Sequence, residues 1–260
     1  MARQVPALAR GLDLLECLRA GPRPMTAGEL TDALRLPRTT VHELLQTLVE
    51  RGCVEPAGDA PRRYRLGLRL FELGNAYAAG LDLPREAGLV AAEVSGSCLE
   101  TVHVAVRDGG DVVYVAKADS THSVRMVSTL GGRLPAHVTA VGKMLLAALP
   151  DSELARLYPP GRRLAGMTPA SIRSPAALRR ELERVRREGL AFDHCESNPD
   201  VNCVAAAVRD HRDATVAALS ISVPILRWDD RREAELAELA RTGAARLSAR
   251  LGAPSRAAAA

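Results

Sequence analysis

Apolar side chains recur at helical spacing in three separate runs within the first fifty residues of the chain. A run of this kind predicts an amphipathic helix, because positions three and four apart share one helical face. The first predicted helix covers residues 5–18 and ends before Gly21 and Pro22, which are typical stop residues. Its predicted buried face consists of Val5, Leu8, Leu12, Leu15 and Leu18.

The second and third predicted helices are separated by a short break at residues 35–37. The second begins at Thr26, because the Thr26 hydroxyl and the Glu29 carboxylate have the spacing of a capping box. The third ends at Gly52, a typical C-terminal stop. Its predicted buried face consists of Val41, Leu44, Leu45, Leu48 and Val49.

Two short strand-like runs follow the third helix, at residues 53–55 and 64–66. The segment between them is rich in Pro and Gly and ends in Arg62 and Arg63, which predicts a hairpin with a basic tip. Three helices followed by such a hairpin predict a winged helix-turn-helix over residues 1–67.

The rest of the chain mixes helical and strand periods. An Asp-Gly-Gly turn at residues 108–110 predicts a hairpin. Consecutive hairpins flanked by helices predict an antiparallel sheet, so the fold class expected for the chain is α+β. The predicted helices are 84–97, 140–149, 176–188 and 229–251, and the predicted strands are 101–106, 112–115, 124–128, 203–208 and 215–223.

A linker helix is expected between the two halves. Leu70, Leu73 and Tyr77 fall at helical spacing directly after the predicted wing. At 260 residues the chain is long enough for two domains with separate cores. We therefore expect a winged helix at 1–67, a linker helix at 68–81, a C-terminal domain at 82–252 and a flexible tail at 253–260.

Composition and charge narrow the classes of function. Aromatic residues make up only 3% of the chain, so a stacking platform for single-stranded nucleic acid is not expected. The net charge of +4 fits a nucleic-acid partner, and Lys117 and Lys143 are the only lysines, so arginine carries nearly all of the positive charge. A GC-rich genome is an alternative cause of the arginine excess.

The cysteines and the apolar runs indicate the compartment. The five cysteines include no Cys-x-x-Cys pair, so neither a disulfide framework nor a zinc site is expected, and we expect no metal and no cofactor. The sequence shows no secretory signal pattern and no apolar run of the roughly 18 residues that a membrane span requires. The sequence therefore predicts a cytoplasmic protein without a membrane partner.

The start of the third helix is the candidate DNA-reading element. Arg38, Thr39, Thr40 and His42 lie at the end of the helix that enters the major groove in helix-turn-helix proteins. Arginine can bind guanine or phosphate, and threonine can donate to phosphate or contact a thymine methyl group. An ordinary helical hairpin with a solvated face fits the spacing equally well.

Several separated segments resemble the IclR family of bacterial regulators. Residues 7–15 (ALARGLDLL), 36–52 (LPRTTVHELLQTLVERG) and 63–74 are similar to its winged helix. Residues 134–149 (LPAHVTAVGKMLLAAL) are similar to its TAxGK signature, and residues 189–224 to its effector-binding segment. The resemblance covers nearly the whole chain, and its motifs occur in the family's order.

This resemblance implies a GAF-like C-terminal domain, a homodimer or homotetramer, and double-stranded operator DNA as a partner. It also implies control by a small-molecule effector, often a carboxylate. By position, Ala140 and Val141 would offer backbone amides, and the start of a helix is an anion-binding end after the Gly-rich loop that precedes it. The side chains implied at the effector are Asp193, Cys203, Ser220 and Ser222.

Residue spacing allows two interpretations of these side chains. Ser220 and Ser222 are two apart on a predicted strand and therefore share a face, and Cys203 begins a predicted neighbouring strand. They either line a ligand site, or the serines form the solvated side of the sheet and Cys203 is a small core residue.

The chain departs from the family pattern at several positions. Glu43 stands where arginine is common in the recognition helix, and its carboxylate would repel phosphate. Cys195 stands where an acidic residue is frequent. The customary glycines of the effector segment are replaced by Asp200, Asp213 and Val223.

Two other classes of protein are alternatives to a DNA-binding regulator. A hydrolase-like enzyme would combine Cys203 or Ser220 with His137, His194 or Asp193, but the sequence has no nucleophile elbow, zinc-protease motif, Walker loop or dinucleotide fingerprint. No catalytic residue is therefore expected. A ligand sensor that does not bind DNA would need the winged helix to act as a protein-binding module.

Overall fold

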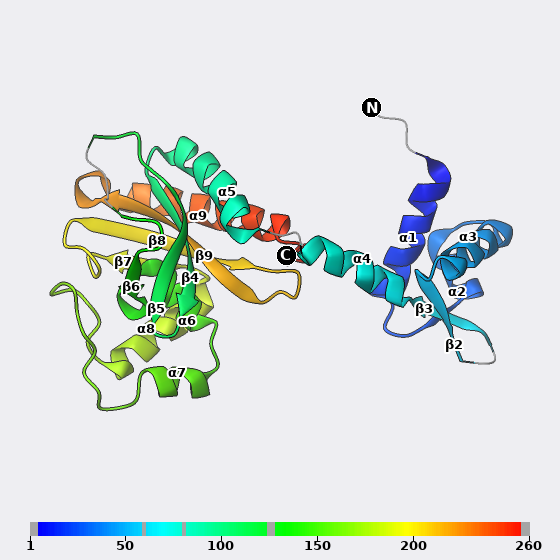
Figure 1. The fold of residues 1–260 in the computed structure, drawn as a ribbon, viewed down its shortest axis with the longest axis horizontal. Helices are drawn as coiled ribbons and strands as arrows, with labels where there is room; N and C mark the ends of the chain where they lie inside the picture. Colours follow the sequence, from blue (N-terminus) through cyan, green and yellow to red (C-terminus); the bar gives the residue numbers. More distant parts are fainter. Residues whose placement is uncertain (1–4, 59–60, 80–81, 124–127, 256–260) are drawn as a thin grey trace. The chain divides into compact units, whose positions relative to one another are not determined.

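The computed structural model describes residues 5–58, 61–79, 82–123 and 128–255 of the chain. The chain divides into two compact units, residues 1–80 and 81–260 (Figure 1). Both units combine helices with antiparallel strands, so the predicted α+β class is confirmed. Among the described residues, no helix is long and apolar enough to cross a membrane.

The N-terminal unit is a winged helix. Its three-stranded sheet has the order β1-β3-β2, and the β2–β3 pair is the predicted hairpin. Strand β1 was not predicted, because two extended residues are too short to show a period. The elements are α1 (Pro6–Ala20), β1 (Met25–Thr26), α2 (Ala27–Leu34), α3 (Arg38–Glu50), β2 (Val54–Ala57), β3 (Arg63–Leu66) and α4 (Leu68–Ala79).

Local chemistry sets the start of α2 as the sequence predicts. The Glu29 amide donates to the Thr26 hydroxyl over 3.2 Å, and the Thr26 amide donates to the Glu29 carboxylate over 2.7 Å. This capping box satisfies two amide groups that a helix start leaves without partners. The core beside it consists of Leu14, Leu18, Leu30, Val41, Leu45, Val54 and Tyr64.

The buried face of α1 differs from the predicted one. Gly11, Leu14 and Leu18 face the core, whereas Val5, Leu8 and Leu12 are exposed by 64%, 64% and 54%. The helix carries apolar residues on two sides, and spacing alone does not tell which side meets α2 and α3. An exposed apolar face therefore remains on α1.

The C-terminal unit contains a six-stranded antiparallel sheet between two layers of helices (Figure 1). Helices α5 and α9 pack on one face, and α6 and α8 pack on the other. The elements are α5 (Leu83–Cys98), β4 (Thr101–Asp108), β5 (Asp111–Ala118), β6 (Arg133–Pro135), α6 (Ala140–Ala147), α7 (Asp151–Leu157), α8 (Pro175–Glu188), β7 (Ala191–His194), β8 (Val201–Arg209), β9 (Thr215–Pro224) and α9 (Asp230–Arg250), with short 3-10 turns η1 (Ala136–Val138) and η2 (Ile225–Arg227).

The sheet order is β6-β5-β4-β9-β8-β7. The predicted hairpin at residues 108–110 and four of the five predicted strands are confirmed within a few residues. Short elements β6, β7 and α7 were missed, because three to seven residues show no clear period. The predicted strand at 124–128 lies outside the described residues except for Ser128, as does the tail at 256–260.

Candidate functional site

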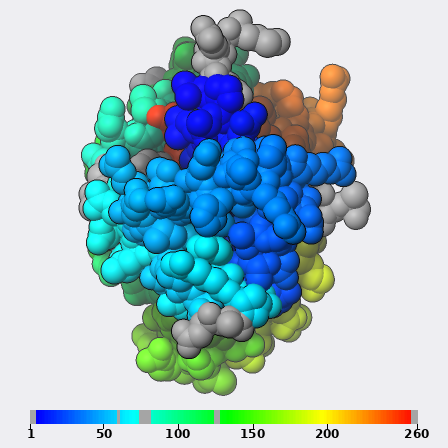
Figure 2. All heavy atoms as spheres, turned by 90° about the vertical axis from the view of Figure 1, so that its right-hand side faces the viewer, coloured from blue at the N-terminus to red at the C-terminus, as the bar shows by residue number. Residues whose placement is uncertain are grey.

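The predicted DNA-reading residues lie together at the start of α3. Arg38, Thr39 and His42 are exposed and Thr40 is partly buried. With Glu43 and residues of α2, the three exposed side chains line a groove of about 580 Å³. Figure 2 shows the heavy atoms of the N-terminal unit as blue to cyan spheres.

Glu43 lines the same groove. Its side chain is exposed beside those of Thr39 and His42, so its charge acts on whatever enters the groove. A carboxylate repels phosphate, but it can accept a hydrogen bond from the amino group of cytosine. In contrast, Arg38 makes no ion pair with another described residue, and its guanidinium is open to a ligand.

The two arginines at the predicted basic tip of the hairpin have different surroundings. Arg62 is exposed, with its guanidinium 5.8 Å from the centre of the Tyr64 ring. Arg63 donates to the Pro24 carbonyl over 3.1 Å and lies 3.4 Å from the Glu29 carboxylate. Arg63 therefore holds the sheet to the start of α2, and Arg62 is the hairpin arginine that is free to meet a phosphate.

In the C-terminal unit, the start of α6 is a compact backbone arrangement. The Gly142 amide donates to the Thr139 hydroxyl over 3.0 Å, and the Lys143 amide donates to the Thr139 carbonyl over 2.9 Å. The amides of Ala140 and Val141 have no acceptor among the described residues. Two N–H groups at the positive end of the helix are therefore left for a ligand.

The segment before α6 differs from the Gly-rich loop that was predicted. Strand β6 and the turn η1 lie between Gly132 and α6, and the turn packs directly against the helix. A Cβ on Gly142 would lie 2.1 Å from the Ala136 carbonyl oxygen, so the Gly of the TAVGK segment permits this contact. The glycine thus positions the α6 start.

The predicted side chains of the effector site lie on the face of the sheet below α6. Register pairs run across four strands from Asp193 through Cys203 and Ser222 to Thr101. A second row on this face contains Ser220 opposite His103. The predicted site residues Ala140, Val141, Asp193, Cys203, Ser220 and Ser222 are all buried. The alternative that the serines form a solvated side of the sheet is therefore wrong.

A chain of hydrogen bonds crosses this face. The Cys203 thiol donates to the Ser222 hydroxyl over 3.2 Å, and that hydroxyl lies 3.3 Å from His103 Nδ1. His103 Nε2 lies 2.6 Å from the hydroxyl of Ser128. Ser220 makes no side-chain hydrogen bond with another described residue, although it is buried. The Ser220 oxygen is not among the fully buried polar atoms without a partner, so this hydroxyl is accessible to a ligand.

His103 and Tyr114 are the aromatic part of this face, with ring centres 4.7 Å apart. Burial, aided by the charge of Lys117, lowers the pKa of His103 to about 4, so its imidazole is neutral near pH 7. Burial also raises the pKa of the Tyr114 hydroxyl. Neither residue was predicted as part of the site, because nothing in an alternating strand distinguishes a histidine or tyrosine that lines a site from one in the core.

The Asp193 carboxylate binds the turn that follows it. Its carboxylate accepts from the Glu196 amide over 2.6 Å and from the Ser197 amide and hydroxyl over 3.2 and 2.5 Å. Both oxygens accept from the chain, so Asp193 holds a turn, and its contact with the effector stays a prediction. Burial raises the pKa of this carboxyl. The turn that it holds presents Glu196 to α6.

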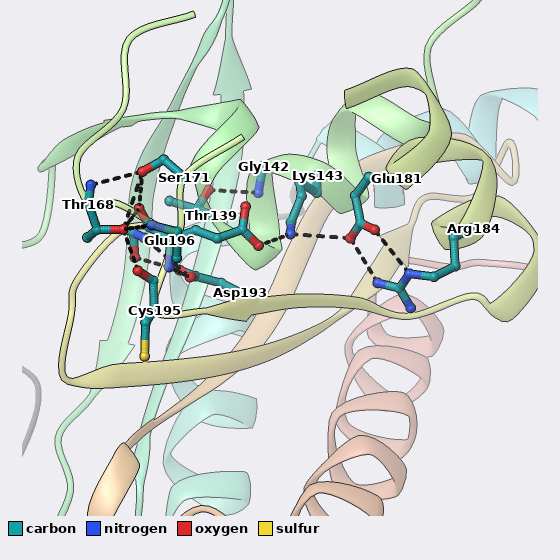
Figure 3. A network of polar contacts seen from close by, with 12 residues as sticks. Thr139, Gly142, Lys143, Thr168, Ser171, Glu181, Arg184, Asp193, Cys195 and Glu196 are labelled. Atoms are coloured by element: carbon teal, nitrogen blue, oxygen red, sulfur yellow. Dashed lines mark hydrogen bonds and ion pairs between the residues drawn. The ribbon is translucent and has the colours of Figure 1, made fainter. Parts of the chain in front are cut away.

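A buried ion pair joins that turn to α6 (Figure 3). The Lys143 ammonium binds the Glu196 carboxylate and lies 3.2 Å from Glu181 of α8, which also pairs with Arg184. Lys143 is among the largest fully buried side chains of the described residues. Burial raises the pKa of Glu196, and Lys143 opposes that rise. The sequence places Lys143 and Glu196 53 positions apart and gives no sign of the pair.

The residues of the enzyme alternative do not form a catalytic group around Cys203 or Ser220. His137 Nε2 bonds the Ala165 carbonyl over 2.7 Å, and the His194 ring stacks on Phe192. Cys203 reaches a serine hydroxyl rather than a base, and burial raises its thiol pKa well above the ordinary value. A raised thiol pKa opposes nucleophilic attack.

The departures from the family pattern occupy turns and one strand. Cys195 and Asp213 have positive φ angles of 57° and 60°, in the left-handed region that glycine prefers. Asp213 lies in the β8–β9 turn, which fits the glycine expected there, since Asp tolerates this region better than most residues. Asp200 lies before β8, and Val223 is buried in β9.

These features define a winged-helix DNA-binding protein with a second domain built on a six-stranded sheet. The model of the C-terminal region of bacterial IclR transcriptional regulators matches residues 75–249, and the model of the IclR helix-turn-helix domain matches residues 7–58. The chain therefore belongs to the IclR family of bacterial transcriptional regulators.

Individual relatives agree with this assignment. The HTH-type transcriptional regulator KdgR of Escherichia coli K12 is 35% identical over 86% of this chain and 84% of its own length. The transcriptional repressor IclR of the same organism is 32% identical over 89% of this chain and 85% of its own. The crystal structure of the Agobacterium tumefaciens repressor BlcR superposes with a TM-score of 0.82 at 33% identity, covering 95% of this chain and 97% of that one.

Proposed function

We propose that this transcriptional regulator binds operator DNA through the start of α3. A small carboxylate bound below α6 changes its affinity for the operator. The observation that supports the effector site is the pair of unused amides at Ala140 and Val141 above a buried polar face. A carboxylate would accept from these amides, and Ser220 would bond a further polar atom. Effector binding then changes operator occupancy only if it favours one state of the regulator.

In the N-terminal unit, Arg38 is proposed to read a base and Thr39, Thr40 and His42 to contact the groove or its phosphates. Replacing Arg38 with alanine should weaken binding to the operator by about 1 to 3 kcal/mol, because a bidentate contact to guanine is lost. Gel-shift titration with operator and scrambled duplex measures this loss. Unchanged operator affinity would contradict the assignment.

Arg62→Ala is the matched control for that experiment. An exposed phosphate contact carries no base information, so this variant should weaken both duplexes by a similar factor and reduce the salt dependence. Arg63→Ala is a poor control, because Arg63 also holds the Pro24 carbonyl and Glu29.

The serines test the effector site. The variant Ser220→Ala, Ser222→Ala should respond to effector only at several-fold higher concentration, because each lost hydrogen bond costs about 0.5 to 1.5 kcal/mol. Operator binding without effector should stay near wild type, since both hydroxyls are buried in the C-terminal unit. The measurement is operator release against the effector found by a metabolite screen.

The single variant Ser220→Ala separates loss of a contact to the effector from loss of hydrogen bonds within the protein. Ser222 also bonds Cys203 and His103, whereas Ser220 has no such partner among the described side chains. The single variant should therefore shift the response with little change in stability. If the double variant responds at the wild-type concentration, the effector site lies elsewhere.

We also propose that the regulator is a homodimer or a homotetramer built from dimers. One winged helix covers only half of a twofold operator, so two copies are needed for useful specificity. The N-terminal unit offers exposed apolar side chains on two helices, Leu8 and Leu12 of α1 and Leu68, Phe71 and Leu73 of α4, together with Val5 directly before α1. Leu70 is partly buried, and the side chain of Tyr77 lies outside the described set.

Acidic residues on the α1 face should break the dimer. The variant Leu8→Glu, Leu12→Glu should sediment as a smaller species than wild type at micromolar concentration, because burying unpaired carboxylates is costly. Arg10→Glu, at another exposed position of α1, is the control and should leave the assembly intact. A wild-type protein that sediments as a monomer with and without operator would contradict the proposal.

A further inference from the structure

One oxygen of the Glu196 carboxylate is buried without a partner. Among the described side chains, Glu196 Oε2 is the buried polar atom for which no hydrogen bond exists. The other oxygen binds Lys143. Figure 3 shows that the oxygen without a dashed line points toward the first turn of α6. Buried polar atoms of this kind are rare in native proteins and call for an external partner.

The rest of Glu196 is fixed in place. Its amide donates to Asp193 over 2.6 Å, and its carbonyl accepts from the hydroxyls of Ser171 and Thr168 over 2.6 and 3.2 Å. Its side chain is 9% exposed and held at one oxygen by Lys143. The free oxygen is therefore a preorganised acceptor that cannot turn away to find water.

The charges around it select the kind of group that can approach. Two cations, Lys143 and Arg184, lie among three carboxylates, Asp193, Glu181 and Glu196. A ligand carboxylate placed against Glu196 would meet like charge, whereas a hydroxyl would donate to the free oxygen. The ligand carboxylate belongs instead at the amides of Ala140 and Val141, which start the same helix as Lys143.

We propose that the effector is a hydroxycarboxylate whose hydroxyl donates to Glu196 Oε2 while its carboxylate accepts from the α6 amides. This inference rests on the proposed function and specifies which carboxylates can act. A hydrogen bond to an ionised acceptor is among the stronger kinds. An analogue that lacks the hydroxyl leaves the buried oxygen without a donor and should therefore bind more weakly.

The test uses acids that differ by one hydroxyl, namely lactate and propionate, 3-hydroxybutyrate and butyrate, and 4-hydroxybenzoate and benzoate. Titration calorimetry on the full-length wild type measures each affinity. In at least one pair, the hydroxy acid should bind at least about tenfold more tightly than its partner. Equal binding of both members in every pair that binds overturns this inference and leaves carboxylate sensing intact. If no acid of any pair binds, the proposed carboxylate sensing fails, and this inference fails with it.

Glu196→Gln supplies a sharper readout. Lys143 can only donate, so the amide oxygen should face Lys143 and the amide NH₂ should replace the free oxygen. The variant then offers a donor. The lactate hydroxyl can accept from it as well as donate, whereas the keto oxygen of pyruvate can only accept, so pyruvate should gain affinity relative to lactate. A ratio of pyruvate affinity to lactate affinity equal to that of wild type overturns the inference.

Glu181→Gln is the matched control. Glu181 lies beside the same ammonium, 3.2 Å away, but its carboxylate is partnered by Arg184. This variant should keep the preference for the hydroxy acid, which separates loss of the acceptor from loss of charge near Lys143. If Glu196→Gln does not fold, the wild-type ligand pairs still decide the question.

Discussion

Replacing Lys143 with methionine is expected to lower the free energy of unfolding of the C-terminal unit by about 3 to 5 kcal/mol. Methionine fills a similar volume but leaves Glu196 as a buried carboxylate without its cation. Trp228, the only tryptophan of the chain, packs against the core of this unit, so its fluorescence reports urea unfolding there. A loss below about 1 kcal/mol would show that the pair does not hold α6 to the Asp193 turn.

A second substitution tests the cause of that loss. In the variant Lys143→Met, Glu196→Leu, no buried charge is left unpaired at this contact, so part of the lost stability should return. Glu181 keeps its partner Arg184 in both variants, so the difference in stability between the two variants reports on Glu196 alone. A double variant less stable than Lys143→Met would contradict the ion-pair explanation.

Acid should destabilise the same unit through His103. The pKa of His103 is lowered to about 4 in the folded protein, against about 6.5 in an unfolded chain. The unfolded state therefore takes up a proton as the pH falls below 6.5, and the folded state does not until pH 4. The stability that the neutral imidazole contributes above pH 6.5 is lost over this window, by about 3 kcal/mol between pH 7.5 and pH 4.

His103→Gln removes this titration. The free energy of unfolding, measured by Trp228 fluorescence, should fall less with pH in the variant than in wild type, and the difference between the two profiles should approach about 3 kcal/mol. Charges near the ring belong to Lys117 and Asp119, and both remain in the variant. Parallel profiles would mean that His103 is protonated in the folded protein as readily as in the unfolded chain.

His211→Gln is the control for that comparison. His211 is exposed between β8 and β9, so its replacement changes the histidine count without touching the face below α6. Its free energy of unfolding is measured over the same pH range. Comparing the two glutamine variants assigns the acid sensitivity to burial of one particular imidazole.

The sequence alone predicts the features that depend on neighbours along the chain. The capping box at Thr26 and Glu29, the buried face of α3 and the β4–β5 hairpin all follow from spacings of a few residues. The family follows too, because its motifs are contiguous and ordered. Exposure of Arg38 at the start of α3 is a local consequence of the same pattern.

Only the tertiary structure decides which faces of the strands and helices are buried. Alternation places Ser220 and Ser222 on one side of β9 but does not say whether a helix lies over them, and here helices cover both faces of the sheet. The same limit explains α1, where two apolar stripes compete and only packing against α2 and α3 selects Leu14 over Leu12.

The polar contacts of the candidate site join residues far apart along the chain. Lys143 meets Glu196 across 53 positions, and His103 meets Ser222 across 119. Asp193, expected to contact the effector, also binds the turn before β8 through both oxygens. No local rule states these pairings, because a buried charge or hydroxyl takes whichever partner the packing of the sheet against α6 brings within reach.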